Sequence, residues 1–174
     1  PKVLVDIVSG VLSIQYGFLG PNYSTISACA SANHAISDAF NLIRLGKADI
    51  ILTGGSEAAI CEAGIGGFNS LKALSTQNEN YASASRPFDQ SRDGFVMGEG
   101  AAALILEDLE HAQKRGATIV AEVLGTGMAA DAYHLTGTHP EGLGAIIGME
   151  EALKEAALSP HQIDYINAHA TSTL

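Results

Sequence analysis

The sequence has few basic residues, and this shortage narrows its possible functions. Only 9 Lys and Arg residues stand against 19 Asp and Glu residues, so the formal net charge is −10. Such a chain lacks the basic surface that attracts nucleic acids or anionic membranes. No apolar run reaches the roughly 18 residues that a membrane-spanning helix needs. We therefore expect neither nucleic acid nor a membrane among the partners of the protein.

Cysteines and metal-binding patterns are equally scarce. The two cysteines, Cys29 and Cys61, are too few for a disulfide framework. No Cys-x-x-Cys or His-x-x-x-His spacing is present to hold a metal ion. The first residues contain no Met and no signal-peptide pattern. These absences predict a protein without a bound metal in a reducing compartment, most simply the cytoplasm.

The remaining pattern is that of an α/β protein. The 174 residues are 47% hydrophobic, enough for a globular domain with a core. Predicted strands alternate with predicted helices, which indicates α/β layers. The strands are expected at 24–28, 48–53, 101–107, 118–124 and 163–168, and the helices at 31–45, 108–115 and 142–158. The strand at 24–28, the helix at 31–45 and the strand at 48–53 are expected to form a parallel βαβ unit. The apolar run 48–53 predicts that its strand is buried on both faces.

Two stretches of the chain lie outside this regular pattern. Residues 54–94 are rich in Gly, Ser and Asn, and we expect mostly loop there, with short helical pieces. An irregular stretch of this length usually carries function. A polar cluster also follows the last predicted strand, and the chain stops soon after it. We therefore expect the chain to be a fragment of a longer protein.

Cys29 lies where the first predicted strand passes into the first predicted helix. A helix start offers unpaired N–H groups and the positive end of the helix dipole, and both favour a nucleophilic thiolate. Neighbouring alanines would leave room for a substrate, and the corner is similar to the nucleophile elbow of hydrolases, without its Gly-x-Ser-x-Gly sequence. The alternative is a buried cysteine that serves as a small hydrophobic residue.

Two histidines are candidate partners for this thiol. His34 follows Cys29 by five residues, and helical rotation would turn its side chain about 140° away, which favours a structural role. His169 ends the last predicted strand, at the sheet edge where α/β proteins place ligands. Thr171 and Thr173 follow it and could hydrogen-bond an amide-bearing substrate. The alternative for His169 is an ordinary surface-loop residue.

Other polar residues give weaker signals. Cys61 has no adjacent base, which favours a structural role. The segment from Asp131 to Thr136 is polar and is a weaker candidate for lining a site.

Six motifs follow one another along essentially the whole chain. They are Ser27-Ala28-Cys29-Ala30-Ser31, Gly54-Gly55-Ser56-Glu57, Gly66-Gly67-Phe68, Ala84-Ser85-Arg86-Pro87-Phe88-Asp89, Arg92 to Gly100 and Asn167 to Thr173. In this order they resemble the elongating β-ketoacyl-acyl-carrier-protein synthases. The resemblance is greatest to the bacterial type II form that extends longer acyl chains.

The resemblance implies a thiolase-like fold of layered α-β-α-β-α form, built from two similar halves. Residues 1–116 would be the later part of the N-terminal half, and residues 117–174 the start of the C-terminal half. The fold would be incomplete in this chain, which would span the junction of the halves. The resemblance also implies a homodimer that pairs through the strand at 48–53.

The resemblance further implies roles for individual residues. Cys29 would carry the acyl chain, and His169 would be the first of two catalytic histidines. The second histidine and a lysine that precedes it are expected beyond residue 174. No metal or redox cofactor is implied, because the substrates travel on the pantetheine arm of acyl carrier protein.

The resemblance also implies contacts with the substrates and the carrier protein, made by residues from several parts of the chain. Thr171 and Thr173 would contact pantetheine, and Thr136 would lie near its channel. Phe68 would line the acyl pocket, and Lys72 would help to dock the acidic carrier protein.

Three functions are compatible with these motifs. The first is a condensing enzyme of fatty-acid elongation. The second is the ketosynthase module of a polyketide synthase, and the third is a non-catalytic, truncated homologue. Without the second histidine, the 174 residues alone are not expected to condense substrates.

Overall fold

The computed structural model describes residues 4–174 of the chain. The chain forms two compact units, each built from two separate stretches of sequence. The first unit contains the described residues up to Gly55 together with Ala103–Ile163, and the second contains Ser56–Ala102 with Asp164–Leu174.

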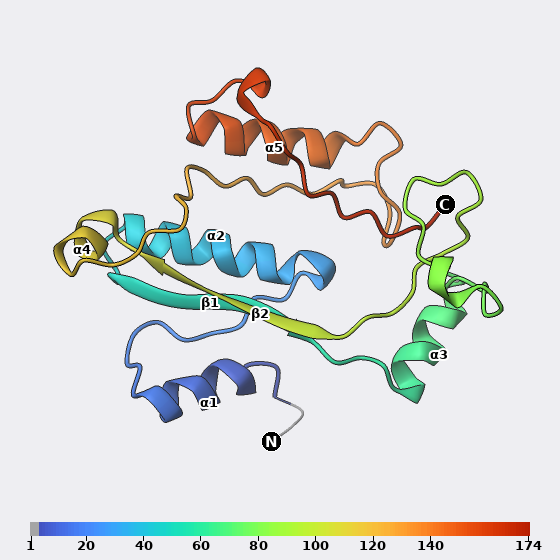
Figure 1. Cartoon of the computed structure of the whole chain (residues 1–174), viewed down its shortest axis with the longest axis horizontal. Coiled ribbons are helices and arrows are strands. Elements are labelled where there is room, and N and C mark those ends of the chain that lie inside the picture. Colours follow the sequence, from blue (N-terminus) through green and yellow to red (C-terminus); the bar gives the residue numbers. More distant parts are fainter. Residues whose placement is uncertain (1–3) are drawn as a thin grey trace. The chain divides into compact units, whose positions relative to one another are not determined.

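Helices make up most of the regular structure (Figure 1). The first unit holds α1 (Ile7–Tyr16), α2 (Ser31–Arg44), α4 (Leu109–Lys114) and α5 (Leu143–Glu155), with 3₁₀ turns η1 (Ala28–Ala30) and η3 (Pro160–Gln162). The second unit holds α3 (Glu62–Ser70) and the 3₁₀ turn η2 (Tyr81–Ser83). The three predicted helices are therefore confirmed as α2, α4 and α5, with shorter ends.

Their boundaries follow from local capping. The Asp108 carboxylate accepts a hydrogen bond from the backbone N–H of His111 at 3.0 Å, which caps the start of α4. Gly46 and Gly116 have φ of 64° and 69°, so each takes the left-handed conformation that ends a helix.

The sheet has two strands within residues 4–174, β1 (Ile50–Glu57) and β2 (Gly100–Glu107). They run in opposite directions in Figure 1, and the Asp108 N–H donates to the Asp49 carbonyl at 2.9 Å where β2 ends beside the start of β1. The predicted βαβ unit is not formed for a different reason, because residues 24–28, its first predicted strand, are no strand in the structure. The glycines at 54 and 55 also do not end β1, which continues to Glu57.

Residues 24–28 form no strand, because their polar groups bond locally to the start of α2. The Thr25 hydroxyl donates to the Ser31 carbonyl at 2.7 Å, and the Ser27 N–H donates to the Ser31 hydroxyl at 2.9 Å. Ser and Thr side chains compete with strand ladders through such bonds. The strand prediction fails here for that reason.

The predicted strands at 118–124 and 163–168 are also irregular in the structure. Just beyond the first of them, the Thr126 N–H donates to the Glu155 carboxylate on α5 at 2.7 Å. Within the second, Tyr165 and Ile166 are exposed. A strand requires a ladder partner, and neither segment has one among the described residues.

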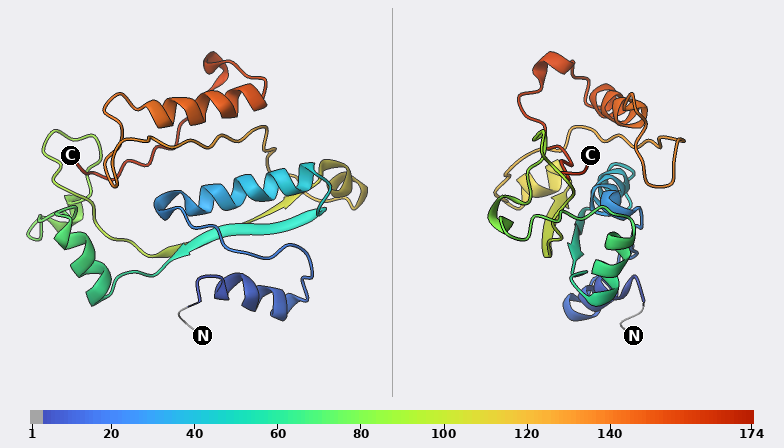
Figure 2. Two further views of the ribbon diagram at one scale, coloured as in Figure 1. Left: turned by 180° about the vertical axis from the view of Figure 1, so that it is seen from behind. Right: turned by 90° about the vertical axis from the view of Figure 1, so that its right-hand side faces the viewer.

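The strand β1 is less buried than its sequence predicts. Thr53 is buried, but Ile50 and Leu52 remain 44% and 37% exposed. The helix α2 lies along β1 in both views (Figures 1 and 2), and Gly55 contacts its first turn closely. Burial on both faces is therefore a wrong prediction for the chain as described.

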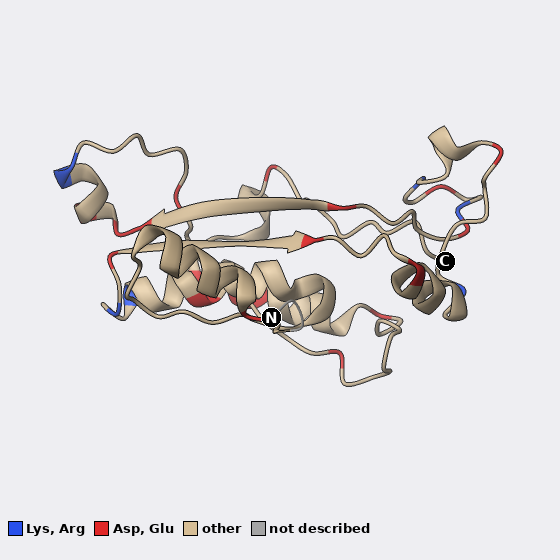
Figure 3. Ribbon diagram, turned by 90° about the horizontal axis from the view of Figure 1, so that it is seen from below, with Lys and Arg blue, Asp and Glu red and all other residues tan. Residues whose placement is uncertain are grey.

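Within the described residues, the structure shows few basic side chains and no long apolar helix, as the composition predicts. Basic positions are few and scattered over the elements drawn in Figure 3. No helix within residues 4–174 is both long enough and apolar enough to cross a membrane.

Glu107, at the end of β2, is held by the side chains of Arg115 and His111. Its carboxylate accepts hydrogen bonds from Arg115 Nε at 2.6 Å and Arg115 Nη2 at 2.5 Å, and contacts His111 Nδ1 at 2.6 Å. Hydrogen bonding to Arg115, followed by that to His111, lowers the pKa of Glu107 from 4.5 to about 2.

We predict that acid weakens the fold through Glu107. Because its pKa is lower in the folded state, its stabilising effect is fully present above pH 4.5 and is lost as the pH falls through about 2. Denaturation midpoints measured across this range should fall more in the wild type than in Glu107→Gln. Glu110→Gln, on the exposed side of α4, is the control. Equal pH dependence in the wild type and Glu107→Gln would contradict the prediction.

Candidate functional site

Cys29 lies in η1, the turn that leads directly into α2. Its side chain is exposed, so the alternative of a buried structural cysteine is wrong. Ala28, immediately before it, has φ of 50°, a left-handed conformation that is uncommon for residues other than glycine. A sharp, strained turn thus presents Cys29 at the start of a helix, as predicted.

Ser31 holds this turn together. Its hydroxyl accepts a hydrogen bond from the Ser27 N–H at 2.9 Å and donates one to the Ala28 carbonyl at 2.8 Å. The Ala30 N–H also donates to the Ser27 carbonyl at 3.0 Å. These bonds fix the backbone on both sides of Cys29, and such support allows a strained conformation to persist.

Cys29 lies beside the N-terminal end of α2. The helix α2 has 14 residues, and its first turn contains no acidic side chain. The free N–H groups and the dipole of this helix start therefore act on the sulfur without a competing carboxylate nearby in the turn. The same N–H groups could stabilise an oxyanion formed when the sulfur attacks a carbonyl.

His34 lies on α2 and is half-buried. The predicted angle between it and Cys29 assumed one continuous α-helix. Cys29 precedes α2 in a 3₁₀ turn instead, so that angle does not apply. The structural role of His34 stays a prediction.

A second group of predicted residues lies in the second unit. His169 is exposed, and the predicted strand before it is absent, so it stands in an irregular segment. Ala170 and Ser172 have φ of 44° and 70°, both left-handed. The hydroxyls of Thr171 and Thr173 lie 2.8 Å apart and are half-buried. The structure thus brings the two predicted threonines together.

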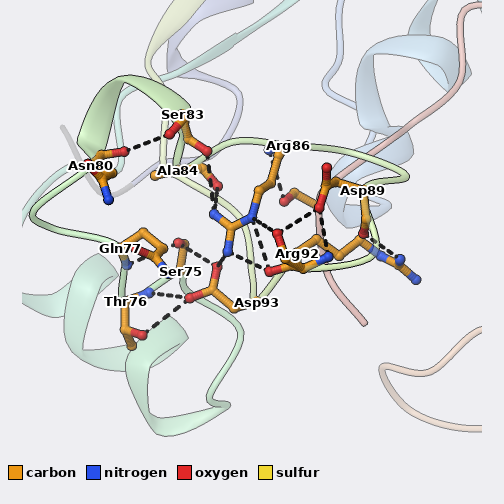
Figure 4. A network of polar contacts seen from close by, with 12 residues as sticks. Ser75, Thr76, Gln77, Asn80, Ser83, Ala84, Arg86, Asp89, Arg92 and Asp93 are labelled. Atoms are coloured by element: carbon orange, nitrogen blue, oxygen red, sulfur yellow. Dashed lines mark hydrogen bonds and ion pairs between the residues drawn. The ribbon is translucent and has the colours of Figure 1, made fainter.

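A network centred on Arg86 and Asp93 organises the loop beside this segment (Figure 4). Arg86 Nη2 lies 2.8 Å from Asp93 Oδ1, and the guanidinium also donates to the carbonyls of Ala84 and Ser91 at 3.0 and 2.6 Å. We call the group of Arg86, Asp93 and their partners the Arg86 hub; its other members are Ser75, Thr76, Ala84 and Ser91.

The hub fixes Asp93 as a carboxylate. The Ser75 hydroxyl donates to it at 2.7 Å and the Thr76 N–H at 3.0 Å. These two bonds, in that order, and the charge of Arg86 lower the pKa of Asp93. Sequence reasoning placed Arg86 and Asp93 in motifs but gave them no role, since residues seven apart in a loop have no periodicity to indicate contact.

A cavity of about 310 Å³ adjoins the threonine pair. Its walls combine apolar Phe88, cationic Arg92 and the backbone and hydroxyls of the terminal segment. It is lined by Pro87, Phe88, Arg92 and residues 170–174. Such a mixture suits a polar, amide-bearing chain.

The other predicted substrate residues stand in separate settings. Phe68 lies on α3, a short helix within the stretch expected to be mostly loop with short helical pieces, and its ring packs edge-to-face on Phe95 at a centroid distance of 5.1 Å. Lys72 follows α3, is exposed and forms no ion pair within the described part of the chain. Thr136 lies in an exposed loop, where its N–H donates to His134 Nδ1 at 3.2 Å.

Cys61 is exposed and precedes the first turn of α3. No cluster of three or more His, Cys, Asp or Glu residues suited to a metal ion occurs among residues 4–174.

Comparisons with known proteins agree on one family. The profile described as "Beta-ketoacyl synthase, N-terminal domain" matches residues 2–112, and "Beta-ketoacyl synthase, C-terminal domain" matches residues 120–174. The predicted boundary between residues 116 and 117 falls between these matches and stays a prediction.

Curated relatives bear names of one activity. The chain is 51% identical over 175 residues to 3-oxoacyl-[acyl-carrier-protein] synthase 2 of Rhizobium meliloti, covering 100% of this chain and 42% of the relative. It is 49% identical over 174 residues to the mitochondrial 3-oxoacyl-[acyl-carrier-protein] synthase of Arabidopsis thaliana, covering 99% of this chain and 38% of the relative. The chain thus spans about two fifths of the length of these relatives.

A solved structure confirms the predicted fold. The chain matches, with a TM-score of 0.92 and 41% identity, a complex titled as a type II polyketide synthase acyl-carrier protein with its ketosynthase bound to the hexaketide. The match covers 95% of this chain and 41% of the other. The layered, thiolase-like fold is therefore present here in part.

We predict that Gly55→Ala disturbs the Cys29 turn. A Cβ added at Gly55 would lie 2.7 Å from the Ala32 Cβ, so the first turn of α2 would have to shift. Crowding of this kind lowers stability by about 1–3 kcal/mol. Denaturation and the rate of Cys29 alkylation by iodoacetamide would both report the shift.

Gly10→Ala provides the matched control, because a Cβ at Gly10 meets nothing within 4 Å. It should leave the alkylation rate of Cys29 unchanged. Equal alkylation rates in Gly55→Ala and the wild type would show that Gly55 does not set the position of this turn.

Proposed function

The chain belongs to the β-ketoacyl synthase family, and on that basis we propose that it is the cysteine-bearing part of an enzyme that elongates fatty acids. The reaction is the decarboxylative condensation of malonyl-acyl carrier protein with an acyl chain held on Cys29. The observation that carries this proposal is the exposed thiol of Cys29, presented by a strained turn at the start of α2.

In the first step, the Cys29 thiolate attacks the carbonyl of an acyl thioester on the carrier protein. A carbon–sulfur bond forms, and the carbonyl becomes a tetrahedral oxyanion near the N–H groups at the helix start. The oxyanion collapses, and the pantetheine thiolate leaves and takes up a proton. The acyl chain is then a thioester of Cys29.

In the second step, malonyl-carrier protein loses CO₂ by cleavage of a carbon–carbon bond. The electron pair passes into the thioester as an enolate, and His169 would donate a hydrogen bond to its oxygen. The enolate carbon attacks the acyl carbonyl on Cys29, and the Cys29 thiolate departs. The product on the carrier protein is two carbons longer. A second histidine from the rest of the enzyme would share the enolate oxygen with His169.

The remaining residues would serve the substrates. Thr171 and Thr173 would hydrogen-bond the pantetheine arm in the cavity that they line. Phe68 would line the acyl pocket, and Thr136 would lie near the pantetheine channel. The mechanism requires no metal or redox cofactor.

Docking of an acidic carrier protein requires local positive charge on an acidic chain. Lys72 supplies one such charge, because it is exposed and forms no ion pair among the described residues. Its backbone N–H donates to the Asn69 carbonyl at 2.9 Å, which holds the Lys72 backbone at the end of α3. We propose Lys72 as part of the docking surface.

A polyketide ketosynthase is the second candidate, favoured by the likeness to the solved ketosynthase complex. Identity supports the fatty-acid function, since it is 49–51% to the two synthases and 41% to that ketosynthase. A non-catalytic homologue is disfavoured by the exposed, strained presentation of Cys29.

We propose the cytoplasm as the compartment. Two exposed, free cysteines suit a reducing environment. Several relatives carry mitochondrial or chloroplastic names, and an organelle is the alternative compartment.

We predict that the complete enzyme is acylated at Cys29. Incubation with acyl-acyl carrier protein and intact-mass spectrometry should show one acyl adduct, which Cys29→Ala abolishes. Cys61→Ala, which removes the other exposed thiol, should keep the adduct. His169→Ala should also keep it but lose malonyl decarboxylation. A normal adduct on Cys29→Ala would overturn the proposed function.

The isolated 174 residues should be alkylated at Cys29 without elongating a chain. They contain only one of the two histidines that the mechanism uses. Chain elongation by this segment alone would show that one histidine suffices.

We predict a homodimeric enzyme that pairs through β1. One edge of β1 pairs with β2, and within the described residues no strand pairs with the other edge. Its Ile50 and Leu52 side chains are also partly exposed. Sedimentation equilibrium of the complete enzyme should give the dimer mass, and a monomer mass at micromolar concentration would contradict this.

A further inference from the structure

The terminal segment, residues 169–173, is docked onto the Arg86 hub by contacts that the reaction scheme does not use. We propose that Ser172 and Arg92 are positioning residues that hold this segment for the decarboxylation step. The inference rests on the proposed function, because it concerns the step assigned to His169. Neither side chain is assigned a contact with the reacting atoms.

Ser172 is the anchor of the segment. It is 3% exposed, the least accessible residue of the segment. Its hydroxyl accepts a hydrogen bond from the Arg86 N–H at 3.1 Å, and its carbonyl accepts one from the Gly94 N–H at 3.0 Å. Ser172 thus binds both ends of the loop that runs from Arg86 to Gly94.

The backbone of Ser172 shows why two bonds are needed. Its φ of 70° lies in the left-handed region, which costs a non-glycine residue conformational free energy. Ala170, with φ of 44°, is in the same region. Such a conformation persists only where surrounding contacts over-determine it, and the bonds from Arg86 and Gly94 supply those contacts.

Because Gly94 has no side chain, its backbone can lie close to that of Ser75 while its N–H donates to the Ser172 carbonyl. Its φ is 144°, and a Cβ there would lie 2.5 Å from the Ser75 nitrogen. Only glycine therefore fits between Ser75 and the terminal segment. A hydrogen bond between two backbone groups, the Gly94 N–H and the Ser172 carbonyl, therefore joins the loop beside Asp93 to the terminal segment.

Arg92 holds the next residue. Its Nε donates to the Thr173 carbonyl at 2.8 Å, and its Nη1 donates to the Asp89 carbonyl at 2.9 Å. It is half-buried and forms no ion pair among the described residues. Its charge thus strengthens hydrogen bonds to two carbonyls, a role that fixes geometry.

The effect reaches the threonines and His169. Ser172 turns inward between Thr171 and Thr173, whose hydroxyls meet at 2.8 Å beside the cavity. His169 lies three residues before this anchor. Release of Ser172 or Arg92 would therefore let the histidine and both hydroxyls shift together, while the Cys29 turn keeps its own hydrogen bonds.

The test separates the two steps in the complete enzyme. Cys29 acylation is timed by mass spectrometry with a p-nitrophenyl acyl ester, a donor that has no pantetheine arm and so does not use the two threonines, and CO₂ release is measured from malonyl-acyl carrier protein. Ser172→Ala and Arg92→Gln should lower decarboxylation about 10- to 100-fold, the scale of a misplacement of about 1 Å. Acylation should stay within about twofold, and Arg92→Lys, which retains a donor, should recover part of the loss.

Ser83→Ala is the matched control, because among residues 4–174 the Ser83 hydroxyl donates only to the Asn80 carbonyl of the same loop. It should leave both steps unchanged. Unchanged decarboxylation in Ser172→Ala and Arg92→Gln would overturn the inference, as would equal losses of both steps. If the wild-type enzyme showed neither acylation nor decarboxylation, the proposed function would be refuted instead of this inference.

Amide hydrogen exchange tests the contacts without any activity. The N–H groups of Arg86 and Gly94 should exchange slowly in the wild type, and that of Arg86 should exchange faster in Ser172→Ala. Rapid exchange of both amides in the wild-type protein would overturn the inference.

Discussion

The ion pair between Arg86 and Asp93 is the interaction on which the second unit depends. Arg86 gathers the carbonyls of its loop, and Asp93 ties that loop to Ser75. An ion pair of this kind gives little net stability by itself, because desolvation offsets much of the attraction. Its value here is geometric, since it holds the backbone N–H groups that bind Ser172.

The two candidate reactive residues are positioned by different physics. Cys29 depends on a helix start, where the hydroxyl of Ser31 supports a strained turn. His169 depends on a loop hub, whose bonds reach it through Ser172. A nucleophile benefits from the electrostatics of a helix end, whereas a hydrogen-bond donor to a developing charge needs accurate placement.

Local signals in the sequence were sufficient for α2, α4 and α5 and their ends, whereas α1 was not predicted. Asp108 and the glycines at 46 and 116 act within one turn of chain, so their roles could be predicted. The strand predictions were wrong where polar groups form local hydrogen bonds instead, as the Thr25 hydroxyl and the Ser27 N–H do with Ser31 at the start of α2. A strand is defined by its partner, and a sequence window does not contain that partner.

The sequence by itself determined the family, through an ordered set of motifs that include a cysteine at a helix start and a histidine followed by paired threonines. The tertiary structure decided which backbone groups hold them. The bonds from Arg86 and Gly94 to Ser172 join residues about eighty positions apart. No periodicity spans that distance, because such contacts arise only when the folded chain returns on itself.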